Sequence, residues 1–278
     1  MASLGKHLPQ RIACLSTEAV EVLYALGEEA RIAGISGFTT RPARARKEKP
    51  KISGFSSARI DKILAVKPDL VLAFSDMQGE ICRELVKAGI EVHHFNQRSI
   101  AGIFAMMETT GRLVGAEDKA LALVAELADQ VEKVRHAAAK LPRRPRVYFE
   151  EWDEPMICGI QWVSELIAIA GGEDVFADLA QHGAARERII AEKFPEGRNA
   201  LAQVAARRPD IVIASWCGKK FQPERFRERF AGLDFPALAT GEVHEIKSAH
   251  ILSPGPVAIQ EGLPQLARII SRWAMSAA

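Results

Sequence analysis

The sequence predicts an α/β protein with two α/β lobes, mainly parallel sheets and one long linking helix. Residues 60–74 and 201–215 repeat one order: a short amphipathic helix, a basic residue, Pro-Asp and an apolar run. Between the repeats, residues 117–141 contain neither glycine nor proline. We therefore expect a lobe over 1–116, a linking helix over 117–141 and a lobe over 142–278, with a ligand cleft between the lobes.

The N-terminal half alternates between strand and helix patterns. A strand over 11–15 ends at Ser16 and Thr17, which suit the N-cap of a helix over 18–26. The apolar run 70–74 lacks polar alternation, which is typical of a strand buried on both faces in a parallel sheet. The same reasoning predicts further strands over 31–35 and 90–95, and helices starting at 58, over 79–88 and over 99–114.

The linking helix and the second half follow from the same signals. Apolar residues recur at helical spacing through the linker, at Leu121, Val124, Leu127, Val131 and Val134. A Pro-containing stretch at 141–145 ends this helix, and a strand over 146–150 opens the second lobe. Gly27 and Gly171 each follow an apolar helix and suit a left-handed helix cap.

Composition and charge exclude several classes of protein. The formal net charge is +2 and no basic stripe favours nucleic acid. The basic run 41–51 is bracketed by prolines and is interpreted as a solvated loop rather than a polyanion site. The four cysteines form no C-x-x-C pair, so no structural zinc site is expected.

The expected location follows from the hydrophobic pattern. No apolar run approaches the roughly 18 residues of a membrane helix, so no transmembrane segment is expected. The first ten residues hold no stretch of signal-peptide length, which predicts a cytoplasmic protein as written. A periplasmic location stays open if an export signal was trimmed. We expect a monomer.

Candidate ligand contacts lie where strands end, because ligands of open parallel sheets sit at the carboxyl ends of the strands. Aromatic residues gather there although they are only 6% of the chain, which suits a large, flat, partly apolar ligand. The alternative is that these rings pack the lobe cores. The predicted ligand-binding residues are Ser16, Thr17, Phe38, Phe55, Phe74, Ser75, Trp152, Trp162, Trp216, Lys247 and His250.

Titratable residues offer fewer signals of enzymatic chemistry. Residues 150–154 place four carboxylates around Trp152, but Pro155 follows, so a solvated rim is expected. His93 and His94 alternate on a strand and are interpreted as lone histidines rather than zinc ligands. No nucleophile elbow, phosphate loop or dinucleotide fingerprint occurs, so no catalytic residue or intrinsic cofactor is predicted.

The motifs together resemble the solute-binding proteins for cobalamin, ferric siderophores and haem that feed ABC importers, over roughly residues 11–273. The matching stretches are Leu15-Ser16-Thr17-Glu18, Ala25-Leu26-Gly27, Ile52-Ser53-Gly54-Phe55-Ser56, Lys67-Pro68-Asp69-Leu70-Val71, Ala170-Gly171-Gly172-Glu173, Arg208-Pro209-Asp210-Ile211-Val212 and Ser253-Pro254-Gly255-Pro256. The stretch 151–155, with Gly159, Trp162 and Leu166, is most similar to the cobalamin-binding branch. The resemblance implies two lobes joined by a helix and a bound cobalamin, haem or ferric chelate.

The resemblance also implies roles for single residues. Phe74, Trp152 and the loop at His250 correspond to ligand contacts. Glu80 resembles the surface glutamate that docks onto a permease, and in the second lobe Glu196 and Glu224 are weaker candidates for the same role.

A different class of function stays open at this point. A metal chelatase of tetrapyrrole metabolism would use His93 or His94, His250 and residues 150–154 as base and metal ligands.

Overall fold

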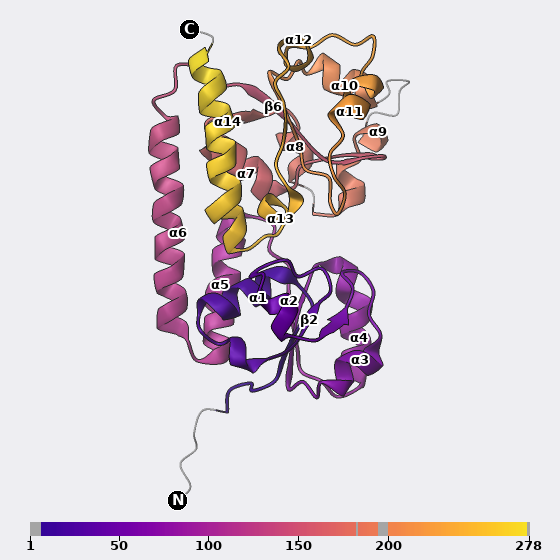
Figure 1. Ribbon diagram of the computed structural model, residues 1–278, viewed down its shortest axis with the longest axis vertical. Helices are drawn as coiled ribbons and strands as arrows, with labels where there is room; N and C mark the ends of the chain where they lie inside the picture. Colours follow the sequence, from indigo (N-terminus) through magenta and orange to yellow (C-terminus); the bar gives the residue numbers. More distant parts are fainter. Residues whose placement is uncertain (1–6, 182, 194–199, 277–278) are drawn as a thin grey trace, which may run out of the picture. The chain divides into compact units, whose positions relative to one another are not determined.

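The computed structural model describes residues 7–181, 183–193 and 200–276. The chain divides into two compact units, one of Met1–Gln97 and Ala101–Leu127, the other of Arg98–Ile100 and Ala128–Ala278 (Figure 1). The division falls inside helix α6 (Glu117–Ala138), so the helix expected over 117–141 is present and contributes to both units. Within the described ranges, no helix is both long and apolar enough to cross a bilayer.

The sheet of the first unit is entirely parallel. Its strand order is β3-β2-β1-β4-β5, so the chain leaves β1 first to one side and later to the other. Such a reversal of direction places the loops after β1 and β4 at a topological switch point, where ligands of open α/β sheets bind. The strands are β1 (Ile12–Cys14), β2 (Ile32–Ser36), β3 (Lys51–Ser53), β4 (Leu70–Phe74) and β5 (Val92–Phe95).

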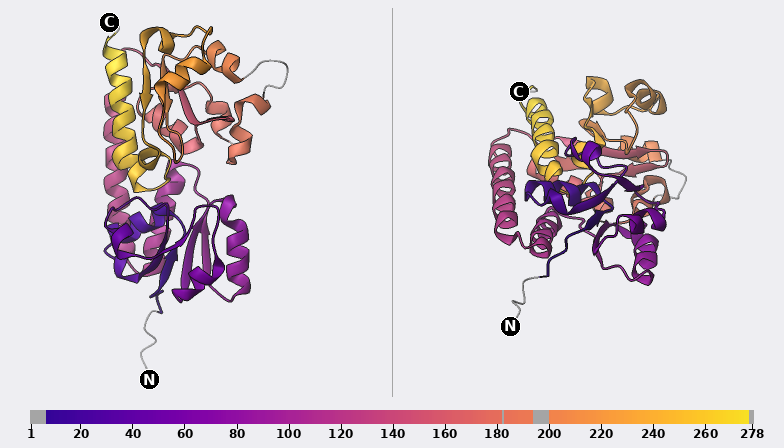
Figure 2. Two further views of the ribbon diagram at one scale, coloured as in Figure 1. Left: turned by 45° about the vertical axis from the view of Figure 1, so that its right-hand side comes forward. Right: turned by 60° about the horizontal axis from the view of Figure 1, so that its bottom comes forward.

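Helices cover both faces of this sheet (Figure 2). The elements expected over 18–26, 79–88 and 99–114 are confirmed within two residues at each end, and Gly27 takes the expected positive φ, at 73°. The helices are α1 (Thr17–Ala25), η1 (Glu29–Arg31), α2 (Ala45–Glu48), α3 (Ile60–Ala65), η2 (Asp76–Gln78), α4 (Gly79–Lys87) and α5 (Ile100–Val114).

The basic run 41–51 is largely exposed, as the interpretation of a solvated segment expected, but it is not an irregular loop throughout. It contains α2 and leads into β3. Arg44 pairs with Glu29 at 2.9 Å, and Arg46 donates to the carbonyls of Gly37 and Thr39 at 2.7 and 2.8 Å. These side chains are used to hold neighbouring backbone, which a charge count cannot reveal.

The second unit repeats the arrangement of the first around its own central strand. Strand β6 pairs in parallel with β8 on one side and with β9 on the other, and β10 extends the sheet beyond β9. The carboxyl half of β6 pairs instead with the antiparallel strand β7. The strands are β6 (Arg146–Asp153), β7 (Met156–Cys158), β8 (Glu173–Asp174), β9 (Ile211–Ala214) and β10 (Val243–Glu245).

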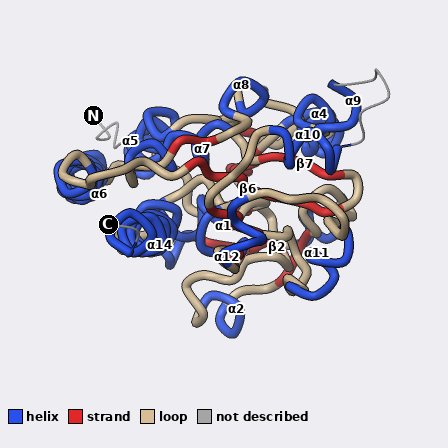
Figure 3. Tube along the Cα trace, turned by 90° about the horizontal axis from the view of Figure 1, so that it is seen from above, coloured by secondary structure: helices blue, strands red, loops and turns tan. Residues whose placement is uncertain are grey.

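The helices of the second unit surround this sheet, and the C-terminal part of α6 runs beside α14, where both are seen end-on in Figure 3. Gln130 of α6 donates to the carbonyl of Ile259 at 2.9 Å and fixes that contact. The helices are α7 (Gln161–Ile169), α8 (Ala177–Ala180), η3 (Ala185–Arg188), α9 (Ile190–Lys193), α10 (Ala200–Ala206), α11 (Pro223–Arg229), α12 (Pro236–Thr240), α13 (Ser248–Ile251), the π-helical turn η4 (Ala258–Gly262) and α14 (Leu263–Ser276).

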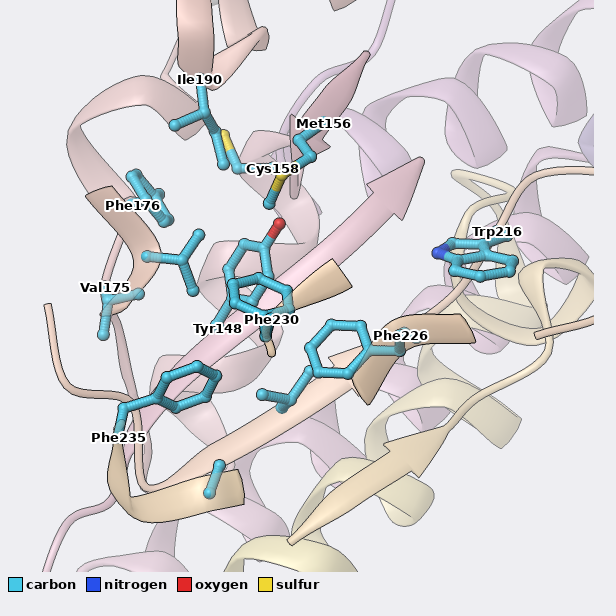
Figure 4. Close-up of a cluster of buried hydrophobic side chains, with 14 of the residues drawn as sticks. Tyr148, Met156, Cys158, Val175, Phe176, Ile190, Trp216, Phe226, Phe230 and Phe235 are labelled. Atoms are coloured by element: carbon cyan, nitrogen blue, oxygen red, sulfur yellow. The ribbon is translucent and has the colours of Figure 1, made fainter. Parts of the chain in front are cut away.

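An aromatic cluster forms much of the core of the second unit (Figure 4). Phe226 and Phe230 lie 4.7 Å apart between ring centroids, and Phe235 lies 5.3 Å from Phe230. Tyr148 of β6 packs into the same cluster and Trp216 lies at its edge, with its indole nitrogen turned toward the sheet. Burial of large rings supplies much of the hydrophobic stabilisation of such a core.

The repeated Pro-Asp motif closes one connection in each unit. Asp69 accepts hydrogen bonds from the backbone N–H groups of Gln10 and Arg11 at 2.7 and 2.9 Å, and Asp210 accepts one from Arg146 at 2.8 Å. The Arg11 side chain in turn donates to the Val66 carbonyl, and the Arg146 side chain donates to the Arg207 carbonyl. Each carbonyl lies at the end of the helix that precedes the Pro-Asp motif. The motif therefore ties the amino end of the central strand to a helix end, on the opposite side of the sheet from the carboxyl edge.

Candidate ligand-binding site

Phe38 lies on a tightly bonded turn at the carboxyl edge of the first sheet. Its ring is 62% exposed, while its backbone N–H donates to Ser36 Oγ at 3.2 Å. Thr17 Oγ1 donates to the Phe38 carbonyl at 3.4 Å, and Arg46 holds the carbonyls on either side. An apolar ring on a fixed backbone costs little conformational entropy when it meets a ligand.

Gln78 ties three segments of this edge together. Its side chain is fully buried, and its Nε2 donates to the carbonyls of Leu15 and Phe55 at 3.0 and 2.8 Å. Its Oε1 accepts from the backbone N–H of Phe74 at 3.0 Å. Nothing in the sequence singled out Gln78, because a glutamine after a strand has no motif to mark it.

The turn after β4 is strained and places an apolar side chain in solvent. Ser75 has φ 73° and ψ 149°, a combination that is costly for a residue with a Cβ. Its Oγ accepts from the N–H of Met77 at 3.3 Å, which stabilises the turn, and the Met77 side chain is 53% exposed. Phe74 itself is buried.

Trp152 presents a half-buried indole at the carboxyl end of β6. Its Nε1 donates to the Glu154 carbonyl at 2.8 Å, and the ammonium of Lys219 lies 4.2 Å from its ring centroid. The same ammonium lies 4.8 Å from the ring of Trp216 and forms an ion pair with Asp153. The two indoles and the lysine thus make one connected group within the second unit, stabilised by cation–π attraction.

Glu150 is the centre of a buried polar network. It has no exposed surface and accepts from Trp216 Nε1 at 2.9 Å, Arg229 Nη2 at 2.6 Å and the Tyr148 hydroxyl at 3.0 Å. Burial raises the pKa of Glu150, and the charge of Arg229 opposes that rise. Arg229 also donates to the Asp153 carbonyl at 2.7 Å, so it links the network to the end of β6.

The solvated rim expected at 150–154 is wrong for most of this segment. Glu150 and Asp153 are buried, and only Glu154 is fully exposed among the carboxylates there. Burial favours a higher pKa for Asp153, but the hydrogen bond and charge of Lys219 outweigh it and the pKa is lowered. Glu151 forms a bidentate pair with buried Arg188, at 2.7 and 3.1 Å. Each cation comes from a distant segment, which is why the local sequence predicted exposure.

Two of the predicted aromatic contacts belong to the core of the second unit. Trp162 is 3% exposed, and its Nε1 donates to the Ile251 carbonyl at 2.9 Å. Trp216 is 2% exposed and packs with Phe221. Trp162 and Trp216 therefore pack in the core of the second unit, which was the alternative to a ligand contact.

His250 and Lys247 lie on the segment that follows β10. Lys247 is exposed and precedes α13, and His250 Nδ1 lies 3.0 Å from Gln265 Nε2 and 3.9 Å from Glu261 Oε2. The π-helical turn packs directly against α13, because a Cβ at Gly262 would come within 2.8 Å of the His250 carbonyl. Single π-turns of this kind frequently occur at functional sites.

The groups that a chelatase would need make other contacts. His94 Nε2 lies 2.8 Å from the Ser75 carbonyl, and burial lowers the pKa of His93. Within the described part of the chain, no three His, Cys, Asp or Glu side chains are placed to hold a metal ion.

The residues suggested for permease docking are at the surface. Glu80 is exposed at the start of α4 and pairs with Arg83 at 2.7 Å. Glu224 is exposed on α11, and Glu196 lies outside the described residues.

Comparison with known proteins places this geometry in context. Residues 12–249 match the family model described as periplasmic binding protein. A cobalamin-binding protein of Halobacterium salinarum is 27% identical over 260 residues, which cover 89% of this chain and 66% of that relative. This chain thus spans slightly less than two thirds of that relative's length.

Two solved structures share the fold. The periplasmic heme-binding protein from Roseiflexus sp. RS-1, in apo form, aligns with a TM-score of 0.79 at 19% identity, covering 96% of this chain and 99% of that one. The periplasmic vitamin B12 binding protein of Vibrio cholerae aligns with a TM-score of 0.75 at 18% identity, with the same coverages. At these identities the likeness shows a common fold.

Proposed function

The chain belongs to the periplasmic binding protein family, and from this we propose that it captures a corrinoid or another metal chelate for an ABC importer. Members of the family are binding proteins, so the proposed role is reversible capture rather than catalysis.

The observation that carries the proposal is that each unit by itself holds an exposed or half-buried apolar side chain on a rigid strand end. Phe38 and Met77 in the first unit, and Trp152 in the second, present apolar side chains from turns whose backbones are hydrogen-bonded. A corrin or porphyrin has two broad, partly apolar faces, which aromatic and thioether side chains contact well. Side chains held in this way within each unit lose little entropy on binding.

We propose a corrinoid as the first choice of ligand. The relative that aligns over 89% of this chain is a cobalamin-binding protein, whereas the heme-binding likeness is one of fold. Cobalamin carries amide side chains around its ring, and Lys247 and His250 offer polar groups at the carboxyl edge of the second sheet.

The proposed partner is an ABC permease in the cytoplasmic membrane, which the protein would approach from the outer side. Glu80 is fixed at the first turn of α4 with its carboxylate exposed, which suits an ion pair with a permease arginine. Glu224 on α11 is the corresponding candidate in the second unit.

Binding is tested directly with the purified chain. Cyanocobalamin, haemin and a ferric siderophore are titrated separately by calorimetry, and the melting temperature is recorded with and without each compound. A ligand at 100 times its Kd stabilises the folded state by about 2.7 kcal/mol, so a clear rise in melting temperature is expected with cyanocobalamin. Absence of binding and of any shift with all three compounds would reject the proposal.

A further inference from the structure

We propose that Gln78 is a positioning residue that holds three ligand-facing segments of the first unit in their binding conformation. The inference rests on the proposed function and deepens it, because it names a residue that sets affinity without touching the solute. No pattern in the sequence marked this position.

The geometry uses every hydrogen-bonding group of the side chain amide. Both Nε2 hydrogens have an acceptor, on Leu15 and Phe55, and Oε1 has a donor, on Phe74. An amide carries two donors and an acceptor on one planar group, and no other side chain of this size offers that set. All three partners are backbone atoms.

Each of the three segments held by Gln78 carries or adjoins a predicted contact. Leu15 directly precedes Ser16 and Thr17, Phe74 directly precedes Ser75, and Phe55 is itself a predicted contact. The loop 53–57 depends most on this bond, because all of it except Ser53 lies beyond the end of β3. Its other anchors include the bonds between the Gly54 N–H and the Ser57 carbonyl and between Ser36 Oγ and the Gly54 carbonyl, and the Ser53 carbonyl accepts from the Gly37 N–H.

The burial of Gln78 argues for a specific role. A buried amide costs free energy unless it is fully bonded, and the amide of Gln78 is bonded at both of its N–H groups and at its oxygen. A bonded amide fixes the mutual placement of the backbones that it touches. If the segments spend only a fraction of the time in the binding conformation, the apparent Kd rises by the inverse of that fraction.

The test compares Gln78→Met, which removes all three bonds at similar volume, with Gln78→Asn, which keeps an amide on a shorter stem. The control is Gln203→Met, at a buried glutamine on α10 that precedes β9 and so lies away from the carboxyl edge. Amide hydrogen exchange of the ligand-free full chain is measured for residues 53–57 and 75–77, and the Kd for cyanocobalamin is measured by calorimetry.

We expect Gln78→Met to raise the exchange rates of these two segments and to raise the Kd about tenfold. A tenfold rise corresponds to segments that occupy the binding conformation about one tenth of the time. Gln78→Asn should give a smaller change of both kinds, and Gln203→Met should change neither. Unchanged exchange and affinity in Gln78→Met would overturn the proposal, as would the same local pattern in the control.

Two remaining outcomes also decide the matter. If neither Gln78 variant folds while Gln203→Met does, Gln78 serves global stability and the positioning role is rejected. If the unmodified chain binds none of cyanocobalamin, haemin and the ferric siderophore, the proposed ligand class fails, and the exchange data alone then support or reject the positioning role.

Discussion

Asp69 and Asp210 occupy the same place in the two units, because each carboxylate accepts a hydrogen bond from a backbone N–H at the start of the central strand. The donors are Arg11, just before β1, at 2.9 Å from Asp69, and Arg146, the first residue of β6, at 2.8 Å from Asp210. In both cases the preceding residues include one with positive φ, Lys67 at 48° and Arg208 at 46°. The repeated sequence motif thus corresponds to a repeated structural connection.

Removal of one such connection should weaken the fold without affecting the candidate site. Asp210→Ala is expected to lower the free energy of unfolding by about 1–2 kcal/mol, because it leaves the Arg146 N–H without its charged acceptor. Urea denaturation measures this loss. Asp61→Ala is the control, since Asp61 is exposed and forms an ion pair with neighbouring Arg59; an equal loss in that variant would contradict the assignment.

The pair of Glu150 and Arg229 should be among the most sensitive to substitution in the second unit. Arg229→Met leaves a fully buried carboxylate without its cation and is expected to cost about 3 kcal/mol of unfolding free energy. Arg227→Met, at an exposed position on the same helix, should have little effect. The double variant Glu150→Gln with Arg229→Met should recover part of the unfolding free energy lost in Arg229→Met. If the losses of the two single variants simply add in the double variant, the two residues are not directly coupled.

Glu18 should make stability depend on pH below neutrality. Burial raises its pKa from 4.5 to about 7, although its own backbone N–H and Ser16 act in the opposite direction. The folded state therefore retains a proton that the unfolded chain has already lost. This contribution to stability is fully present below pH 4.5, declines as the pH rises and is gone above pH 7.

The measurement is the free energy of unfolding of Glu18→Gln and the unmodified chain between pH 4 and pH 8. Between pH 4.5 and 7 the difference should shift by about 3 kcal/mol in favour of Glu18→Gln, because glutamine cannot ionise. A difference that stays constant across this range would show that Glu18 ionises normally.

Trp152 should contribute directly to ligand affinity. Trp152→Ala is expected to raise the Kd for cyanocobalamin about tenfold, equivalent to about 1.4 kcal/mol, through loss of an aromatic contact. Trp273→Ala provides a matched control, because both rings are half-buried and each has a cation 4.2 Å from its centroid. Equal effects of the two substitutions, measured by calorimetry, would indicate a general loss of structure.

Much of the fold could be predicted because its signals are local. Helix and strand patterns, the glycines at positions 27 and 171 and the absence of breakers in α6 each depend on a few neighbouring residues. The repeated Pro-Asp motif also revealed the relationship between the halves, although its hydrogen-bonding role became evident only from the coordinates.

The candidate site was harder to predict because its contacts join distant segments. Residues 150–154 read as a solvated rim, yet Glu150 meets Trp216 and Arg229, and Glu151 meets Arg188. Gln78 showed no signal at all, since its three partners lie in other segments or in the backbone of its own turn.

By itself the sequence determined two repeated α/β halves, the helix between them and the strand ends at which ligand contacts are expected. Only the tertiary structure decided which charged residues are buried, which indole is available and which amide ties the loops together. The reason is physical: periodicity and turn chemistry act over a few residues, whereas burial and ion pairing depend on partners that folding brings from 20 to 80 positions away, as Glu150 and Arg229 show with a separation of 79.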